Sequence, residues 1–170
     1  NISGLIEEME KACAVLGVSA KFVLAVNNST PDYADYIGHL ADKSDGQIVA
    51  LQLGDMDGRP FSYAYIKALE EAKKLGEIVV EMDAGGSFPV KYAMEMVQIL
   101  LGDPSVDAVF SNRFFHSGRV WNMFNHRPSR IATSLTGTLL ANAFLPLGKV
   151  IPDMTSGLSV VRSDVVNKVF

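Results

Sequence analysis

The chain has 170 residues, of which 48% are apolar and 20% charged, a composition typical of a globular domain and unlike that of a disordered segment. Fifteen Lys and Arg against nineteen Asp and Glu give a net charge of -4, and the basic residues are scattered, which argues against a nucleic-acid partner. One cysteine, Cys13, excludes an internal disulfide and a cysteine metal cluster. No secretory signal and no bilayer-spanning apolar run is visible, so one cytoplasmic domain covering residues 1–170 is expected.

Helices and strands are predicted to alternate along the chain. Apolar residues recur at helical spacing over residues 2–16, which predicts an opening helix that buries Cys13. Strands are predicted at residues 21–26, 47–53, 78–82, 106–110 and just after 157, and helices at 31–43, 60–75, 89–101, 129–147 and from Ser163, which is expected to cap the last one. Apolar strands between helices imply an α/β fold, with a mainly parallel, doubly wound sheet covered by helices on both faces.

The segment 77–89, E-I-V-V-E-M-D-A-G-G-S-F-P, combines an apolar strand, an acidic turn and a helix start. Asp83 follows the strand directly, and the two glycines after it allow a sharp turn. Ser87 and Pro89 resemble a helix cap and a first-turn proline. Because ligands of open α/β sheets sit outside the carboxyl ends of the strands, Asp83 is the first candidate site residue.

Four segments occur in an order and spacing that extend along nearly the whole chain. They are V-N-N-S-T at residues 26–30, V-V-E-M-D-A-G-G-S-F-P at 79–89, S-N-R-F at 111–114 and D-M-T-S-G-L at 153–158. Together they resemble family-2 glycosyltransferases of the GT-A fold, and within them the dolichyl-phosphate mannose synthase (polyprenyl-phosphate hexosyltransferase) group. The resemblance implies a GT-A-like, Rossmann-like fold. The chain begins where that family has already passed its first strand, so a fragment, or a chain that lacks this strand, is expected.

The resemblance also implies an activity. It implies an inverting enzyme that moves a hexose from a GDP- or UDP-hexose to a polyprenyl phosphate or a glycan acceptor. Asn27 and Asn28 would contact the nucleotide, and Asp83 would hold Mg²⁺ or Mn²⁺ on the diphosphate. Arg113 would lie near the phosphates, and Asp153 would orient the acceptor or act as a catalytic base.

Two acidic positions of that family are replaced in this chain. The D-x-D pair reads Asp83-Ala84-Gly85, and the aspartates of the base-binding turn are Asn27 and Asn28. Because Mg²⁺ is often held by only one or two carboxylates together with waters and phosphate oxygens, Asp83 alone still offers an anchor, with weaker metal affinity expected. The alternative is a non-catalytic, glycosyltransferase-like binding or assembly protein. A nucleotidyltransferase-like enzyme would need a Gly-rich phosphate loop, and none is visible.

Several of these residues have a purely structural alternative. Asp83 could serve only as a turn residue, and Arg113 as a surface cation. Glu81 lies on the same strand face as Asp83 and is a conceivable second carboxylate that would point deeper into the sheet.

Helix 129–147 is predicted to be a core helix. Its alternative is a partly exposed apolar face resting on a membrane surface, which would suit a lipid-phosphate acceptor.

Overall fold

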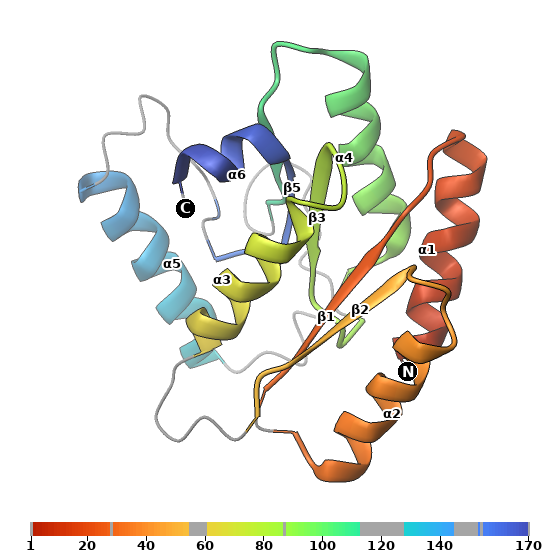
Figure 1. Ribbon diagram of the computed structural model, residues 1–170. Helices are drawn as coiled ribbons and strands as arrows, with labels where there is room; N and C mark the ends of the chain where they lie inside the picture. Colours follow the sequence, from red (N-terminus) through yellow and green to blue (C-terminus); the bar gives the residue numbers. More distant parts are fainter. Residues whose placement is uncertain are drawn as a thin grey trace. The chain divides into compact units, whose positions relative to one another are not determined.

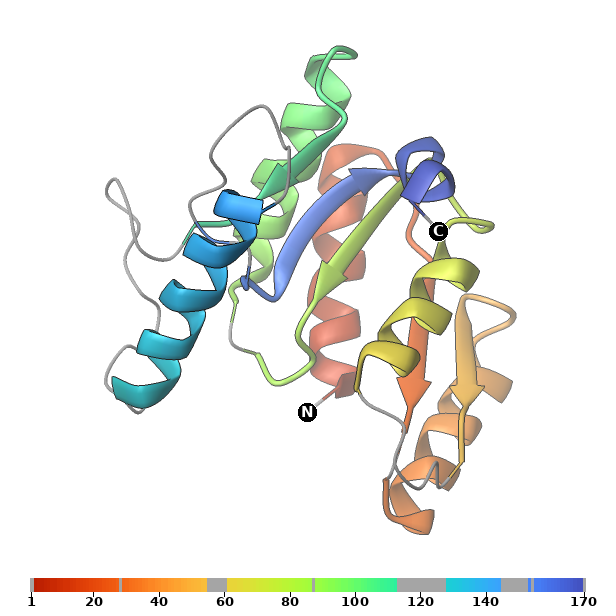
Figure 2. The ribbon, with the colours of Figure 1, turned by 90° about the vertical axis from the view of Figure 1, so that its left-hand side faces the viewer.

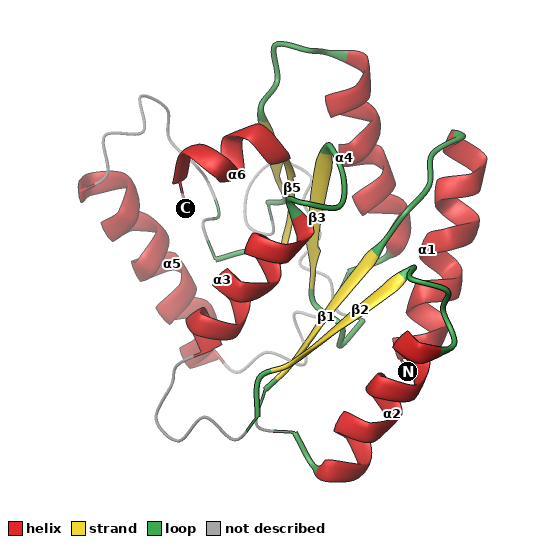
Figure 3. Ribbon diagram, viewed as in Figure 1, coloured by secondary structure: helices red, strands yellow, loops and turns green. Residues whose placement is uncertain are grey.

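Figure 1 shows the computed structural model, which describes residues 2–27, 29–54, 61–86, 88–112, 128–144, 153 and 155–169. The elements are α1 (Ile2–Leu16), β1 (Phe22–Val26), α2 (Pro31–Asp42), β2 (Ile48–Gln52), α3 (Phe61–Ala72), β3 (Ile78–Met82), α4 (Val90–Gly102), β4 (Ala108–Phe110), α5 (Pro128–Phe144), β5 (Leu158–Arg162) and α6 (Ser163–Val169). The predicted α/β class is confirmed, because each predicted helix and strand is present near its expected position (Figure 3).

The chain folds as two compact units. The first comprises Asn1–Leu5 and Val80–Val160, and the second comprises Ile6–Val79 and Val161–Phe170. The division passes through α1, β3 and β5. The single domain expected for residues 1–170 stays a prediction.

The second unit is built on a pair of parallel strands. β1 and β2 pair in register from Phe22 opposite Ile48 to Val26 opposite Gln52. Helix α3 packs mainly against β1 and α2 mainly against β2, and the two helices lie on opposite sides of the strand pair (Figure 2). Since parallel strands need a crossover connection, α2 between them is the expected βαβ arrangement. Ile37 of α2, 1% exposed, is the most deeply buried large side chain of this unit.

Cys13 lies on the buried face of α1, as predicted. Cys13 is the one cysteine of the sequence and is 6% exposed. Burial disfavours the charged thiolate and therefore raises the pKa of Cys13. A thiol in that state is a poor nucleophile, which fits a small core residue.

The remaining described strands form a three-stranded sheet in the order β3-β5-β4. Ser163 N donates to Glu77 O at 2.9 Å, and Asp83 N donates to Gly157 O at 3.2 Å. Residue numbers fall along β5 as they rise along β3, so these two strands are antiparallel. The described strands thus form a parallel pair and a second small sheet in which β5 runs antiparallel to β3, where one mainly parallel sheet was predicted.

Helix α4 supplies much of the core beside this sheet and packs on β4. Its buried side is formed by Val90, Ala93, Met94, Met96, Val97 and Leu100. The helix begins one residue later than predicted, with Pro89 at the N-cap and no side-chain cap bond. At Ser163, predicted to cap the last helix, the hydroxyl donates to the Gly76 carbonyl oxygen and so ties the start of α6 to the residues before β3.

Helix α5 differs from the core helix that the sequence predicts. Leu139 and Phe144 are 70% and 80% exposed, whereas Thr138 is only 5% exposed. Gly137 faces the turn before β5, because a Cβ there would lie 3.7 Å from Thr155 Cγ2. The helix therefore buries Thr138 and leaves Leu139 and Phe144 exposed, while Ile131 and Leu135 are half-buried. None of the described helices is long and apolar enough to cross a membrane.

Candidate functional site

The turn after β3 is held by the side chain of Asp83. Its Oδ1 accepts a hydrogen bond from Gly85 N at 3.0 Å, which is an Asx turn, and the residue is exposed. Gly86 has φ +73°, a conformation that L side chains rarely adopt, so this position of the turn needs glycine. The sharp, acidic turn predicted at this strand end is confirmed.

The same turn contacts the segment that leads into β5. Asp83 N donates to Gly157 O at 3.2 Å. A Cβ on Gly157 would lie 3.7 Å from Asp83 Cβ and 3.6 Å from Phe88 Cε2, so the two chain segments pack in direct contact. The second and fourth motif segments, far apart in the sequence, therefore lie side by side.

Ser111 brings the third segment to the same edge of the sheet. Its backbone N donates to Leu158 O at 3.2 Å, and its hydroxyl forms a hydrogen bond with the Ser156 hydroxyl. Ser111 follows the last residue of β4, and Leu158 is the first residue of β5. The carboxyl ends of β3 and β4 and the start of β5 thus meet, and they bring three of the four motif segments together.

Asp153 is buried beneath this edge, at 1% exposure. Its Oδ1 accepts hydrogen bonds from Thr155 N at 3.3 Å and from Thr155 Oγ1 at 3.2 Å. Such bonds satisfy a buried carboxylate and hold the turn before β5 in shape. Asp153 therefore positions this turn, and its role toward an acceptor stays a prediction.

Glu81 is engaged within the sheet. The hydroxyl of Ser159, a residue that is 6% exposed, donates to Glu81 Oε2 at 2.8 Å. This bond links β3 and β5 next to the Asp83–Gly157 contact, so Glu81 helps to align the two strands. Ser159 has no counterpart in the sequence analysis, because a serine within an apolar strand gives no signal of its partner.

Asn27 follows β1 and belongs to the second unit. Its Oδ1 is buried and has no hydrogen-bond partner, a property that no other buried side-chain polar atom of the described residues shares. Asn28 and Arg113, predicted to contact the nucleotide and its phosphates, lie outside the described residues.

Asp83 is chemically suited to hold a divalent cation. Hard cations prefer carboxylate oxygens, and an exposed strand-end carboxylate offers them. Gly85 carries no side chain, and a Cβ there would lie 3.2 and 3.3 Å from the two carboxylate oxygens of Asp83. Within the described residues, no three His, Cys, Asp or Glu side chains form a metal-binding group. Asp83 can therefore offer a carboxylate oxygen to a cation, and a metal ion at this position stays a prediction.

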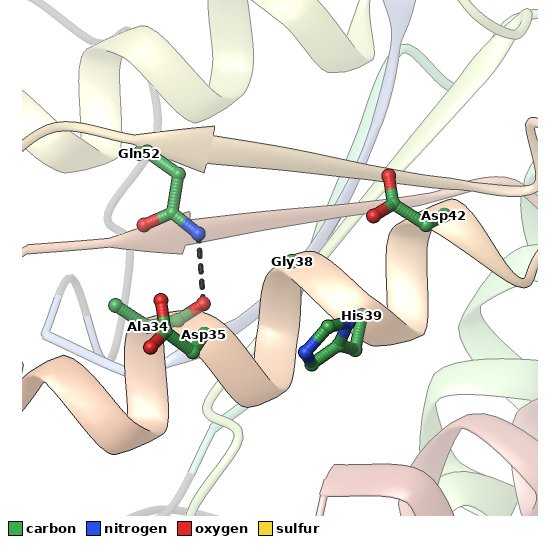
Figure 4. Close-up of a pocket in the computed structure, with 6 residues that line it drawn as sticks. All are labelled: Ala34, Asp35, Gly38, His39, Asp42 and Gln52. Carbon is green, nitrogen blue, oxygen red and sulfur yellow. Dashed lines mark hydrogen bonds between the residues drawn. The ribbon is translucent and has the colours of Figure 1, made fainter.

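The second unit also has a shallow groove between α2 and β2, drawn in Figure 4. Its lining residues are Ala34, Asp35, Gly38, His39, Asp42 and Gln52. Gln52 Nε2 donates to Ala34 O at 2.9 Å across one end of it. No residue of the four motif segments lines this groove, and the sequence analysis did not predict it.

Comparison with known proteins finds a likeness among solved structures. No protein-family model matches the chain, and no curated protein matches its sequence. Among solved structures, mannosyl-3-phosphoglycerate synthase from Rubrobacter xylanophilus is similar, with a TM-score of 0.44 and 19% identity. The match covers 92% of this chain and 57% of that one. This degree of likeness is too low to transfer a substrate, a cofactor or a reaction to this chain.

Proposed function

We propose that this chain is a glycosyltransferase domain that moves a hexose from a nucleotide sugar to an acceptor. The observation that carries the proposal is the hydrogen bond from Asp83 N to Gly157 O, which joins a strand-end carboxylate to the turn held by Asp153. Ser111 adds a third motif segment at the same sheet edge. The carboxyl ends of strands are where ligands of α/β sheets bind, so this edge is the proposed donor and acceptor site.

The proposed reaction breaks the bond between the hexose C1 and the diphosphate oxygen and forms one between C1 and an acceptor oxygen, with inversion. The leaving nucleoside diphosphate carries developing negative charge, which a Mg²⁺ or Mn²⁺ ion held by Asp83 would offset. In this proposal Arg113 pairs with the same phosphates through its guanidinium, and Asn28 contacts the nucleotide.

The proposed acceptor is a polyprenyl phosphate. Its phosphate is already an anion near neutral pH, so transfer to it needs no strong base, and a buried Asp153 that only shapes the site is sufficient. Helix α5 supports a lipid acceptor, because Gly137 packs on Thr155 of the site while Leu139 and Phe144 on the helix are exposed. Those apolar side chains suit peripheral contact with the cytoplasmic surface of a membrane.

A non-catalytic binding module is the second candidate. It is favoured by one feature, the replacement of the family's second carboxylate by Gly85. Titration calorimetry with UDP- and GDP-hexoses, with and without Mn²⁺, followed by an assay for transfer to polyprenyl phosphate, separates the two. Metal-dependent binding with turnover supports the enzyme, whereas binding without turnover supports the module.

Replacing Gly85 by Asp should restore a two-carboxylate site. The new carboxylate would sit beside Asp83, since even its Cβ lies 3.2 Å from an Asp83 oxygen. Like charges this close repel each other, so Gly85→Asp is expected to melt at a lower temperature than the wild type without metal. Mn²⁺ bound between the carboxylates of residues 83 and 85 would offset their repulsion. Its addition should therefore raise the melting temperature more in Gly85→Asp than in the wild type. Thermal unfolding at increasing Mn²⁺ concentration measures both effects.

The matched control is Gly85→Asn, which adds a side chain of the same size without charge. It introduces the same steric contact with Asp83 but no second carboxylate, so its melting temperature should respond to Mn²⁺ as the wild type does. Equal Mn²⁺ responses of the Asp and Asn variants would show that no metal site forms between residues 83 and 85.

A further inference from the structure

Helix α5 turns an uncharged, mostly apolar side to solvent. From Ile131 to Phe144 the sequence contains no Asp, Glu, Lys, Arg or His. The exposed residues of this stretch share one side of the helix, here called the outer face of α5, and they are Ala132, Thr133, Thr136, Leu139, Leu140, Ala143 and Phe144. The exposed side of α1, by contrast, carries Glu7, Glu8 and Lys11, as is usual for a helix on a protein surface.

The polarity of α5 is the reverse of the one that water favours. Thr138 is 5% exposed, whereas Leu139, Leu140 and Phe144 are 70%, 52% and 80% exposed. The three large apolar side chains lie within the last two turns of the helix, so they form one patch. Apolar side chains that gather on an exposed surface mark a place where the protein contacts something apolar.

The size and composition of the outer face favour a lipid surface over a second copy or another protein. A stable protein interface buries about 800 Å² on each partner. The three large side chains fall short of that area by themselves, since even a fully buried aromatic side chain supplies only about 150–250 Å². Protein interfaces are also enriched in Tyr, Trp and Arg, and the outer face has none of these residues. Leu and Phe that enter a bilayer need no partner of matched shape.

The lack of charge sets the outer face apart from most membrane-binding helices. Such helices usually present Lys and Arg, which anionic lipids attract. The outer face is uncharged, and the chain as a whole carries a net charge of -4, so anionic headgroups would not attract it. Binding would therefore depend on insertion of Leu139, Leu140 and Phe144 among the lipids. Bulky side chains insert most readily where curvature leaves the lipids loosely packed.

We propose that the outer face of α5 binds a lipid bilayer by apolar insertion alone and thereby selects loosely packed, strongly curved membranes. The inference extends the proposed membrane contact to a mode of recognition, and it does not depend on hexose transfer. Gly137 of the same helix faces Thr155 in the turn before β5. A bilayer on the outer face would therefore lie close to the sheet edge that is the proposed acceptor site.

Sedimentation with phosphatidylcholine vesicles of two sizes tests this selection. Small sonicated vesicles should bind the wild type at least severalfold more tightly than large extruded vesicles of the same lipid. Raising the salt concentration should leave the binding unchanged, because no pair of opposite charges contributes to it. Adding phosphatidylserine to the vesicles should not strengthen it.

Leu139→Gln and Phe144→Gln should each lower the affinity for small vesicles by about tenfold or more, the effect of withdrawing one large apolar side chain from the bilayer. Both side chains are largely exposed in the free protein, so the melting temperatures should match that of the wild type. The matched control is Val15→Gln in α1. It removes an apolar side chain that is 86% exposed but lies outside the outer face, and it should bind vesicles as the wild type does.

Several results would overturn the assignment. They are a wild type that does not bind small vesicles or binds both sizes equally, binding that requires phosphatidylserine and is lost at high salt, and variants of the outer face that bind as tightly as the wild type. A wild-type dimer that Leu139→Gln dissociates would instead make a second copy the occupant. Transfer by the wild type to a short-chain, water-soluble polyprenyl phosphate without vesicles tests the proposed function separately, so either proposal can fail while the other stands.

Discussion

Asp83→Asn is expected to lower metal-dependent hexose transfer by about a hundredfold or more. The metal ion that this carboxylate would hold stabilises the negative charge on the leaving diphosphate by several kcal/mol in the transition state. The fold should be retained. An asparagine Oδ1 can still accept the hydrogen bond from Gly85 N, and the backbone bond from residue 83 to Gly157 O is unaffected. The rate of transfer from a nucleotide-hexose at varied Mn²⁺ concentration measures the metal-dependent activity, and the melting temperature shows whether the fold is retained.

Asp103→Asn is the matched control. Asp103 is also exposed, and its Oδ1 accepts a hydrogen bond from Ser105 N at 2.9 Å, the same two-residue turn that Asp83 forms with Gly85. Asp103 lies after α4, outside the four motif segments. Its variant should keep full transfer and the same metal dependence. Transfer that is unchanged in Asp83→Asn, or reduced equally in both variants, would remove Asp83 from the metal site.

Leu100→Ala should lower the free energy of unfolding by about 2–5 kcal/mol, the usual cost of truncating a large side chain in a core. Leu100 is 0% exposed and lies on the buried side of α4. Removing its side chain takes apolar contacts from the core and leaves a cavity that the surrounding helix and strands fill only partly. Urea unfolding of the wild type and the variant measures the difference.

The adjacent residue supplies the control for this prediction. Leu101 is 51% exposed, and Leu101→Ala should change the unfolding free energy by less than about 1 kcal/mol, because a half-exposed side chain loses little burial. Comparable losses in the two variants would mean that α4 faces the sheet differently from the described structure.

Local patterns determined most of the elements. The spacing of apolar residues along α1 was sufficient to predict a helix that buries Cys13, and the apolar run 78–82 followed by an acid and two glycines predicted β3 and its turn. These predictions succeeded because helical and strand periodicities, and the backbone freedom of glycine, are properties of neighbouring residues. Asp83 was predicted from its own segment, whereas Asp153 was predicted from the resemblance that four segments carry together.

The direction and burial of elements were decided by tertiary structure. An apolar strand such as β5 has the same composition in either direction, and only its bonds to β3 show that it is antiparallel. Helix α5 is apolar enough for a core, yet Thr138 is buried and Gly137 faces Thr155, while Leu139 and Phe144 are exposed.

The sequence by itself therefore determined the α/β class and the order of the elements, since both follow from short-range patterns. Only the tertiary structure showed that Asp83, Ser111 and Gly157 meet at one sheet edge, that Asp153 is buried in a turn and that Asn27 has an unpartnered oxygen. Contacts, burial and hydrogen-bond satisfaction depend on residues far apart in the chain, and no local pattern encodes them.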